Sequence, residues 1–272
     1  SFGSRTLVFN GEIYNYIEVR KSIAALGHHF ETSSDTAALI NALAEWGTAG
    51  LERLEGMWAF AMHDRTDGSL ILSRDRFGEK PLYFYRPRRG EIIFGSEVKF
   101  VQALSDTSFT VNTGQVHRYL VNGYRSLYQQ NETFFKEIEE IPRGSVLRVA
   151  ADGRETLTSY WSPRYQECRD LSFEAAVSET KALLLRSVEL RLRADVPVAF
   201  CLSGGIDSNA LLGLAHRELG YPVHAFSVLN EDARYDEKDL IDVAVKHFNV
   251  PHTALSLSKK SFLEDLHQMI QY

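Results

Sequence analysis

Cysteine is scarce in this sequence, whose 272 residues include only two, Cys168 and Cys201. Two isolated cysteines provide neither the framework of a small disulfide-rich secreted protein nor the paired spacing of a zinc site. Cys201 follows the apolar stretch 196–200, which predicts a short buried strand. We therefore interpret Cys201 as a small hydrophobic core residue.

Long apolar runs and an excess of basic residues are also missing. No stretch approaches the roughly 20 apolar residues that cross a bilayer, and no secretory signal pattern stands at the start. The 36 acidic residues outnumber the 30 basic ones, for a formal net charge of −6, whereas nucleic-acid-binding proteins usually carry a basic excess. We therefore expect a cytoplasmic protein with no membrane span and no nucleic-acid partner.

What the sequence does contain is a glycine loop, the segment SGGIDS at residues 203–208. It lies between the apolar stretch 196–200 and a helix-forming stretch, 209–217. Two glycines let several backbone N–H groups converge on one anion, and the start of the next helix adds its positive end. The segment therefore predicts a phosphate site, although glycines that only shape a turn are the simpler alternative. It is not a Walker A loop, which needs a lysine and another spacing.

The C-terminal part of the chain alternates strands and helices. A long amphipathic helix is predicted at 173–192, with Ser172 as its N-cap. After the glycine loop, the stretches 222–228, 236–248 and 252–257 predict strand, helix and strand. This alternation predicts a parallel, Rossmann-like α/β sheet that binds ligands at the carboxyl ends of its strands. Three strands make such a domain incomplete.

The N-terminal part predicts an antiparallel sheet. Short β-prone segments joined by tight turns follow one another from residue 6 to about 158, and two helices at 16–26 and 35–46 are available to cover them. We predict an α+β layered domain. Arg74, Asp75 and Lys80 are interpreted as a buried ion-pair network. A stretch without periodicity, 160–170, marks the boundary between domains 1–160 and 172–272.

Six segments of the N-terminal part can be compared with known families by their residues and their order along the chain: FNGEIYN, SSDT, LEGMWAFAMHD, RDRFGEKPLYF, GSEVK and IPRGSVLRV. Together with SGGIDS, they resemble the glutamine-hydrolysing asparagine synthetases. That family joins a class II glutamine amidotransferase domain, of the N-terminal-nucleophile hydrolase fold, to a synthetase domain of the ATP-pyrophosphatase type. The resemblance implies the first domain at residues 1–160 and the start of the second at 172–272.

The resemblance implies a glutamine site in the first domain. Asn10, Gly11 and Glu12 match the family's NGE segment, and Asp35 matches the aspartate of its SDT segment. Asp35 would pair with the substrate's ammonium group, while the Gly11 N–H and the Asn10 amide would form an oxyanion hole. Taken alone, Asp35 is equally suited to capping the helix beside it, and Asn-Gly to a hairpin turn.

The family's nucleophile is missing from this sequence. It is an N-terminal cysteine whose α-amine acts as the base, and no cysteine precedes Cys168. Ser1 lies only nine residues before Asn10, too close to match the nucleophile, and we interpret it as a break in a longer chain. We expect a chain truncated at both ends, with no catalytic residue and no glutaminase activity of its own.

The resemblance also implies an ATP site in the second domain. Asp207 would help to hold Mg²⁺, which shares the charge of the departing pyrophosphate. Two alternatives stay open, since Asp207 could cap a helix and Val228 could be a core residue. The residues that match the family's ATP contacts are Leu202, Ser203, Gly204, Gly205, Asp207, Ser208 and Val228.

The activity that the resemblance implies is asparagine synthesis. ATP would adenylate aspartate, because a carboxylate has no usable leaving group, and ammonia from glutamine would then displace AMP. Glutamine and aspartate, or another carboxylate, would be the substrates, ATP and Mg²⁺ the cofactors, and a homodimer the assembly to test. The alternatives are a β-lactam synthetase-like enzyme, an amide-forming enzyme of surface-polysaccharide pathways, and a non-catalytic nucleotide-binding module.

Overall fold

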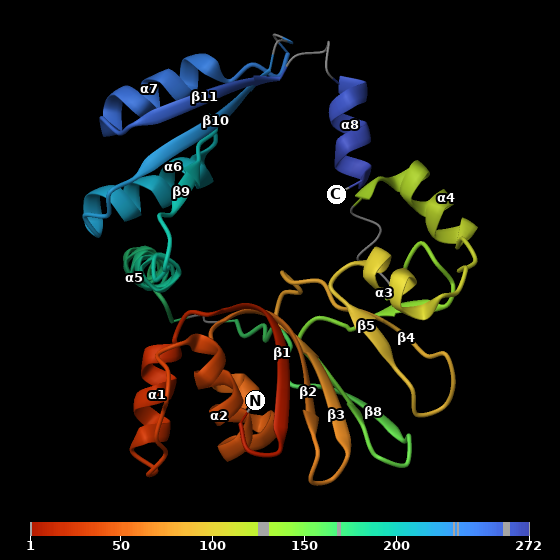
Figure 1. Cartoon of the computed structure of the whole chain (residues 1–272). Helices are drawn as coiled ribbons and strands as arrows, with labels where there is room; N and C mark the ends of the chain where they lie inside the picture. Colours follow the sequence, from red (N-terminus) through yellow and green to blue (C-terminus); the bar gives the residue numbers. More distant parts are fainter. Residues whose placement is uncertain are drawn as a thin grey trace. The chain divides into compact units, whose positions relative to one another are not determined.

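Figure 1 shows the computed structural model of the chain. The structure describes residues 2–124, 131–167, 170–230, 232, 234–257 and 262–271. Contacts divide it into two compact units, Ser1–Gln166 and Glu167–Tyr272. The linker cysteine Cys168 lies outside the described residues.

The first unit is built on a five-stranded antiparallel sheet with the order β1-β2-β3-β7-β8. In strand β2 the large apolar side chains point to one face of the sheet and the small ones to the other, because side chains alternate along a strand. Trp58 and Phe60 enter one core, whereas Ala59 and Ala61 enter another. The strands are β1 (Arg5–Ile13), β2 (Gly56–Asp64), β3 (Ser69–Arg74), β7 (Ser145–Val149) and β8 (Glu155–Ser159).

Helices α1 (Tyr16–Ala24) and α2 (Asp35–Trp46) cover the face of the sheet that carries Trp58, and a 3₁₀ helix, η1 (Gly47–Arg53), follows them. Ser34 is the N-cap of α2, because its Oγ accepts a hydrogen bond from the Ala37 amide at 3.2 Å. Trp58 at the centre of this core is 0% exposed.

A second, smaller antiparallel sheet has the order β5-β4-β6. Its strands are β4 (Tyr83–Tyr85), β5 (Ile93–Gly95) and β6 (Ile138–Glu140), and two helices, α3 (Val98–Ser105) and α4 (Thr113–Asn122), lie between β5 and β6 in the sequence. Leu82 and Phe84 of this sheet join the core formed by Ala59 and Ala61. The predicted α+β layered fold is confirmed.

Arg74 and Asp75 are buried where the two sheets meet, with exposures of 8% and 0%. The Arg74 guanidinium pairs with Glu140 of β6 at 2.7 Å. Asp75 accepts hydrogen bonds from backbone amides instead, among them those of Phe77 and Lys80 at 3.0 Å. The predicted ion-pair network is therefore wrong in its partners, because turn amides satisfy the Asp75 carboxylate.

The second unit is a three-stranded parallel sheet with the order β11-β10-β9 and helices between the strands. The predicted parallel α/β arrangement is confirmed. Its elements are α5 (Phe173–Arg191), β9 (Ala199–Cys201), α6 (Ile206–Gly213), a π-helical turn η3 (Leu214–Glu218), β10 (His224–Asn230), α7 (Lys238–Phe248), β11 (His252–Leu257) and α8 (Phe262–Gln271).

Two predictions for the second unit are wrong. Strand β9 has three residues, and Cys201 at its end is exposed, because among the described strands β9 is an edge that pairs only with β10. The apolar stripe of α5 is buried at Val188, but Leu183 is 62% exposed, since the helix packs on this core mainly through its last turns. None of the helices described is long and apolar enough to cross a membrane.

Candidate functional site

The NGE segment lies near the end of β1, the first strand of the large sheet. Asn10 is paired with Ala59, so its side chain shares the face of Ala59, toward the second sheet. There the Asn10 Nδ2 donates to Ser96 Oγ at 3.0 Å. Glu12, two residues on, points to the same side of the strand and is exposed.

Gly11 faces Trp58 across the strand pair at a distance that excludes a side chain. A Cβ there would lie 2.2 Å from the Met57 carbonyl oxygen. Backbone hydrogen bonds in an antiparallel pair come from every second residue, and the Tyr14 amide donates across the pair to Glu55 O at 2.8 Å. The backbone amides of Asn10 and Glu12 therefore also point to β2. The backbone amides of Gly11 and Ile13 point the other way, to the open edge of β1.

Asp35 lies at that edge, as the first residue of α2. Its Oδ2 accepts the Ile13 amide at 3.0 Å and its Oδ1 accepts the Thr36 amide at 2.6 Å. The helix cap is Ser34. Within the described ranges no cation pairs with the Asp35 carboxylate. The structure thus brings the NGE and SDT segments together and leaves Asp35 as an anion next to the Gly11 edge.

The glycine loop connects β9 to α6 at the carboxyl edge of the parallel sheet. Ser208 Oγ lies 3.2 Å from the Ser203 amide, which donates to it, and Ser203 Oγ accepts the Gly205 amide at 3.2 Å. The Gly204 amide donates to Glu237 Oε2 at 2.9 Å. The amides of Ser203, Gly204 and Gly205 are therefore all hydrogen-bonded within the protein, two to neutral hydroxyls and one to a carboxylate.

Asn209 was not among the residues predicted to form the site, yet it shapes this loop. Its Nδ2 donates to the carbonyl oxygens of Ser203 at 3.1 Å and Gly205 at 2.7 Å. Turning these carbonyls toward Asn209 directs the amides of the loop the other way. An asparagine directly after a glycine loop is the only sequence signal for this role.

The remaining predicted ATP residues differ in their exposure to solvent. Leu202 is 3% exposed, and its amide and carbonyl are both hydrogen-bonded, to Phe226 O and Ser227 Oγ. Val228 is 60% exposed on β10. Asp207 is exposed in the first turn of α6. Core packing therefore does not account for Val228.

No group of three or more His, Cys, Asp or Glu side chains suited to a metal ion occurs among the residues that the structure describes. The exposed Asp207 carboxylate has no hydrogen bond or ion pair there either. Asp207 is the exposed carboxylate beside the glycine loop that could hold Mg²⁺, an ion that usually binds one or two carboxylates together with substrate phosphates.

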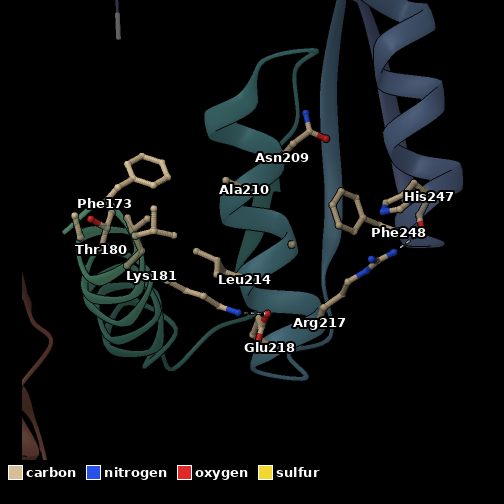
Figure 2. A pocket seen from close by; sticks show the side chains of 14 residues that line it. Phe173, Thr180, Lys181, Asn209, Ala210, Leu214, Arg217, Glu218, His247 and Phe248 are labelled. Carbon is tan, nitrogen blue, oxygen red and sulfur yellow. Dashed lines mark hydrogen bonds and ion pairs between the residues drawn. The ribbon is translucent and has the colours of Figure 1, made fainter.

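Figure 2 shows an apolar groove of about 720 Å³ between α5 and the α6, η3 and α7 helices. An ion pair between Lys181 and Glu218, at 2.9 Å, lies at its rim. None of the predicted ATP residues lines it. Asn209 does, but its amide group donates to carbonyl oxygens of the glycine loop, so this groove is separate from that loop.

Comparison with protein families accounts for the first unit. Residues 1–161, more than half of the chain, match the family model for the glutamine amidotransferase domain. The chain belongs to the glutamine amidotransferase family. Residues 179–272 match the asparagine synthase family model, so the resemblance to glutamine-hydrolysing asparagine synthetases is confirmed at the level of the family.

Relatives of this amidotransferase chain share nearly its whole length. It is 31% identical over 280 residues to the glutamine-hydrolysing asparagine synthetase 3 of Bacillus subtilis, covering 97% of this chain and 45% of the relative. It is 31% identical over 263 residues to a putative asparagine synthetase of Methanocaldococcus jannaschii, covering 95% and 49%. The chain thus spans about half the length of these relatives.

Proposed function

We propose that the protein carrying this chain is a glutamine-dependent asparagine synthetase. A carboxylate oxygen of aspartate would attack the α-phosphorus of ATP and release pyrophosphate. Ammonia from glutamine would then form the amide bond and release AMP. Residues 1–160 would bind glutamine and residues 172–272 would begin the ATP-binding domain. The strand–loop–helix junction at residues 203–208, on a chain of the amidotransferase family, is the observation that carries this proposal.

The open edge of β1 supports a glutamine site. The Gly11 amide and the Asp35 carboxylate, which holds the Ile13 amide, are two residues apart along this edge, or about 6.7 Å. An extended glutamine could place its ammonium group on Asp35 and its side-chain carbonyl oxygen on the Gly11 amide. Asn10 lies next to Gly11 and could donate to the same oxygen, as an oxyanion hole requires.

The second unit supports binding of the ATP phosphates at the glycine loop. The loop amides lie beside the N-terminus of α6, where the positive end of the helix favours an anion. The hydroxyls of Ser203 and Ser208 lie in this loop, 2.9 Å from each other. Val228, exposed on the adjacent strand β10, would contact the base or ribose, and Leu202 would support the loop from the core.

Asp207 would hold Mg²⁺ or its waters beside the phosphates. When bound, this ion shares the negative charge that develops on the departing pyrophosphate. The carboxylate is free to do this because it is exposed in the first turn of α6. A cytoplasmic setting and a homodimer stay predictions.

A β-lactam synthetase-like enzyme is the second candidate, because such enzymes share this two-domain architecture. The pairing of Asp35 with the Gly11 edge favours the asparagine synthetase, since an enzyme that does not hydrolyse glutamine has no need to hold it. A surface-polysaccharide amidotransferase would differ only in its acceptor carboxylate, and a non-catalytic module would bind ATP without releasing pyrophosphate.

The test is pyrophosphate release by the full-length protein with ATP, Mg²⁺ and either aspartate or other carboxylates. We expect release that depends on aspartate, with formation of asparagine from glutamine or ammonia. Release with a different carboxylate would transfer the proposal to another acceptor. ATP binding without release under any of these conditions would contradict a ligase and favour the non-catalytic module.

A further inference from the structure

One amide of the phosphate loop carries an anion that belongs to the protein. The Gly204 N–H donates to the carboxylate of Glu237, which lies 33 residues away in the sequence, at 2.9 Å. The nearby cations are paired elsewhere, Lys238 with Asp242 and Arg234 with Asp232, both at 2.6 Å. Among the described residues, Glu237 thus has no positive partner and only the loop amide as a donor.

Close packing holds Glu237 next to the loop. It directly precedes α7, and a Cβ on Gly204 would lie 2.8 Å from Leu240 Cδ1 and 3.3 Å from Glu237 Cβ. Strands β9 and β10 are parallel neighbours, so the segments that follow them leave the same edge of the sheet. The loop needs glycine at 204 because the first turn of α7 lies against it.

We propose that Glu237 is an internal competitor for pyrophosphate that determines the affinity of the loop for its ligand. A carboxylate oxygen and a phosphate oxygen are both anionic acceptors, and the single Gly204 N–H cannot serve both at full strength. The incoming phosphate must displace Glu237, and like charges at this distance repel. The inference rests on the proposed nucleotide site and adds to it a residue that weakens binding and favours release of the pyrophosphate product.

The test compares three forms of the chain: wild type, Glu237→Gln and Asp236→Asn. Glutamine keeps the size of Glu237 but not its charge. Asp236→Asn is the matched control, because it removes a neighbouring charge that touches the Lys238 amide and not the loop. Each form is titrated calorimetrically with inorganic pyrophosphate, ATP and adenosine.

We expect Glu237→Gln to bind pyrophosphate and ATP about tenfold more tightly, equivalent to about 1.4 kcal/mol, and adenosine as wild type does. Asp236→Asn should bind all three like wild type. Unchanged or weaker pyrophosphate binding by Glu237→Gln would overturn the proposal. Equal tightening in Asp236→Asn would overturn it too, because net charge alone would then explain the effect.

A second measurement tests the contact without any ligand. With ¹⁵N-glycine labelling, Glu237→Gln should shift the Gly204 amide resonance of the ligand-free chain and Asp236→Asn should not. An unshifted resonance in Glu237→Gln would refute the contact. If pyrophosphate binds as expected but the full-length protein releases none from ATP, the ligase function fails while the role of Glu237 stands.

Discussion

The carboxylate of Asp35 accepts a hydrogen bond from the amide of Ile13, at 3.0 Å. This contact joins the end of β1 to the start of α2 and brings together two segments that lie 22 residues apart in the sequence. It also fixes the direction of the Asp35 side chain, along the edge to which the Gly11 amide points. The proposed glutamine site depends on this relationship.

Replacing Asp35 by asparagine removes the charge that is proposed to hold the ammonium group of glutamine. The Ile13 and Thr36 amides are accepted by different oxygens of Asp35, and asparagine keeps only one acceptor oxygen, so we expect the free energy of unfolding to fall by about 1–3 kcal/mol. Glutamine affinity should fall about 10- to 100-fold, since a charge-assisted hydrogen bond to the ammonium group is lost. Calorimetric titration with glutamine measures this, and Glu31→Gln is the control for net charge. Wild-type affinity in Asp35→Asn would exclude the ammonium contact.

Replacing Gly11 by alanine should disrupt the pairing of β1 with β2. The new Cβ would lie 2.2 Å from the Met57 carbonyl oxygen. Because this oxygen belongs to the backbone of β2, it cannot move away as a flexible side chain could. We expect a loss of about 3 kcal/mol in the free energy of unfolding, measured by urea titration with tryptophan fluorescence. Gly114→Ala is the control, because a Cβ there meets nothing closer than 3.4 Å and should cost less than about 0.5 kcal/mol. Equal stability of the two variants would refute the close approach.

Replacing Asp75 by alanine should lower the free energy of unfolding of the first unit far more than replacing an exposed carboxylate does. The carboxylate is 0% exposed and accepts four backbone amides, those of Trp58, Phe77, Glu79 and Lys80. The hydrogen bond from the Trp58 amide is buried and the other three are partly buried. A buried donor without a partner costs about 1–3 kcal/mol, so we expect a loss of about 3 kcal/mol in total. Glu79→Ala, which removes a neighbouring exposed carboxylate, should change stability by less than about 0.5 kcal/mol. A small effect of Asp75→Ala would show that the turn finds other partners.

Asp64 should make the first unit less stable in acid. Hydrogen bonds from the Thr66 amide and the Ser4 hydroxyl, with the Arg5 charge, lower the pKa of Asp64 from 3.8 to about 2. Because the folded pKa lies below the unfolded one, this contribution is complete above pH 3.8 and is lost as the pH falls toward 2.

The difference in urea midpoint between wild type and Asp64→Asn should therefore be constant from pH 7 to about 5 and shrink below pH 4. A difference that is independent of pH down to 2.5 would contradict the lowered pKa.

Local patterns were enough to predict the parallel sheet and the glycine loop between its first strand and the helix that follows. Alternating apolar stretches, glycines and caps such as Ser172 act over a few residues, and Ser172 does accept the Ala175 amide at 3.2 Å. The three-residue strand β6 carries too little periodicity to be recognised. Its place is decided by pairing with β4, which lies more than 50 residues earlier in the chain.

The candidate sites were predictable only in part, for the same reason. At Asn10, Asp35 and the glycine loop, the residue types themselves indicate the binding roles predicted for them. The contact between Gly204 and Glu237 does not, because it depends on how α7 packs after the strand next to β9. The amphipathic pattern of α5 likewise does not reveal that Leu183 is exposed.

The two faces of β2 have a consequence for the length of this strand. Trp58, Phe60 and Met62 enter the core under the helices, while Ala59 and Ala61 leave the second sheet just enough room to approach. Deleting one residue from the strand would exchange these faces, forcing an indole into space shaped for a methyl group and leaving methyl groups beneath α2. Changes of side chain in β2 can be compensated by neighbours, but a change in the number of its residues cannot.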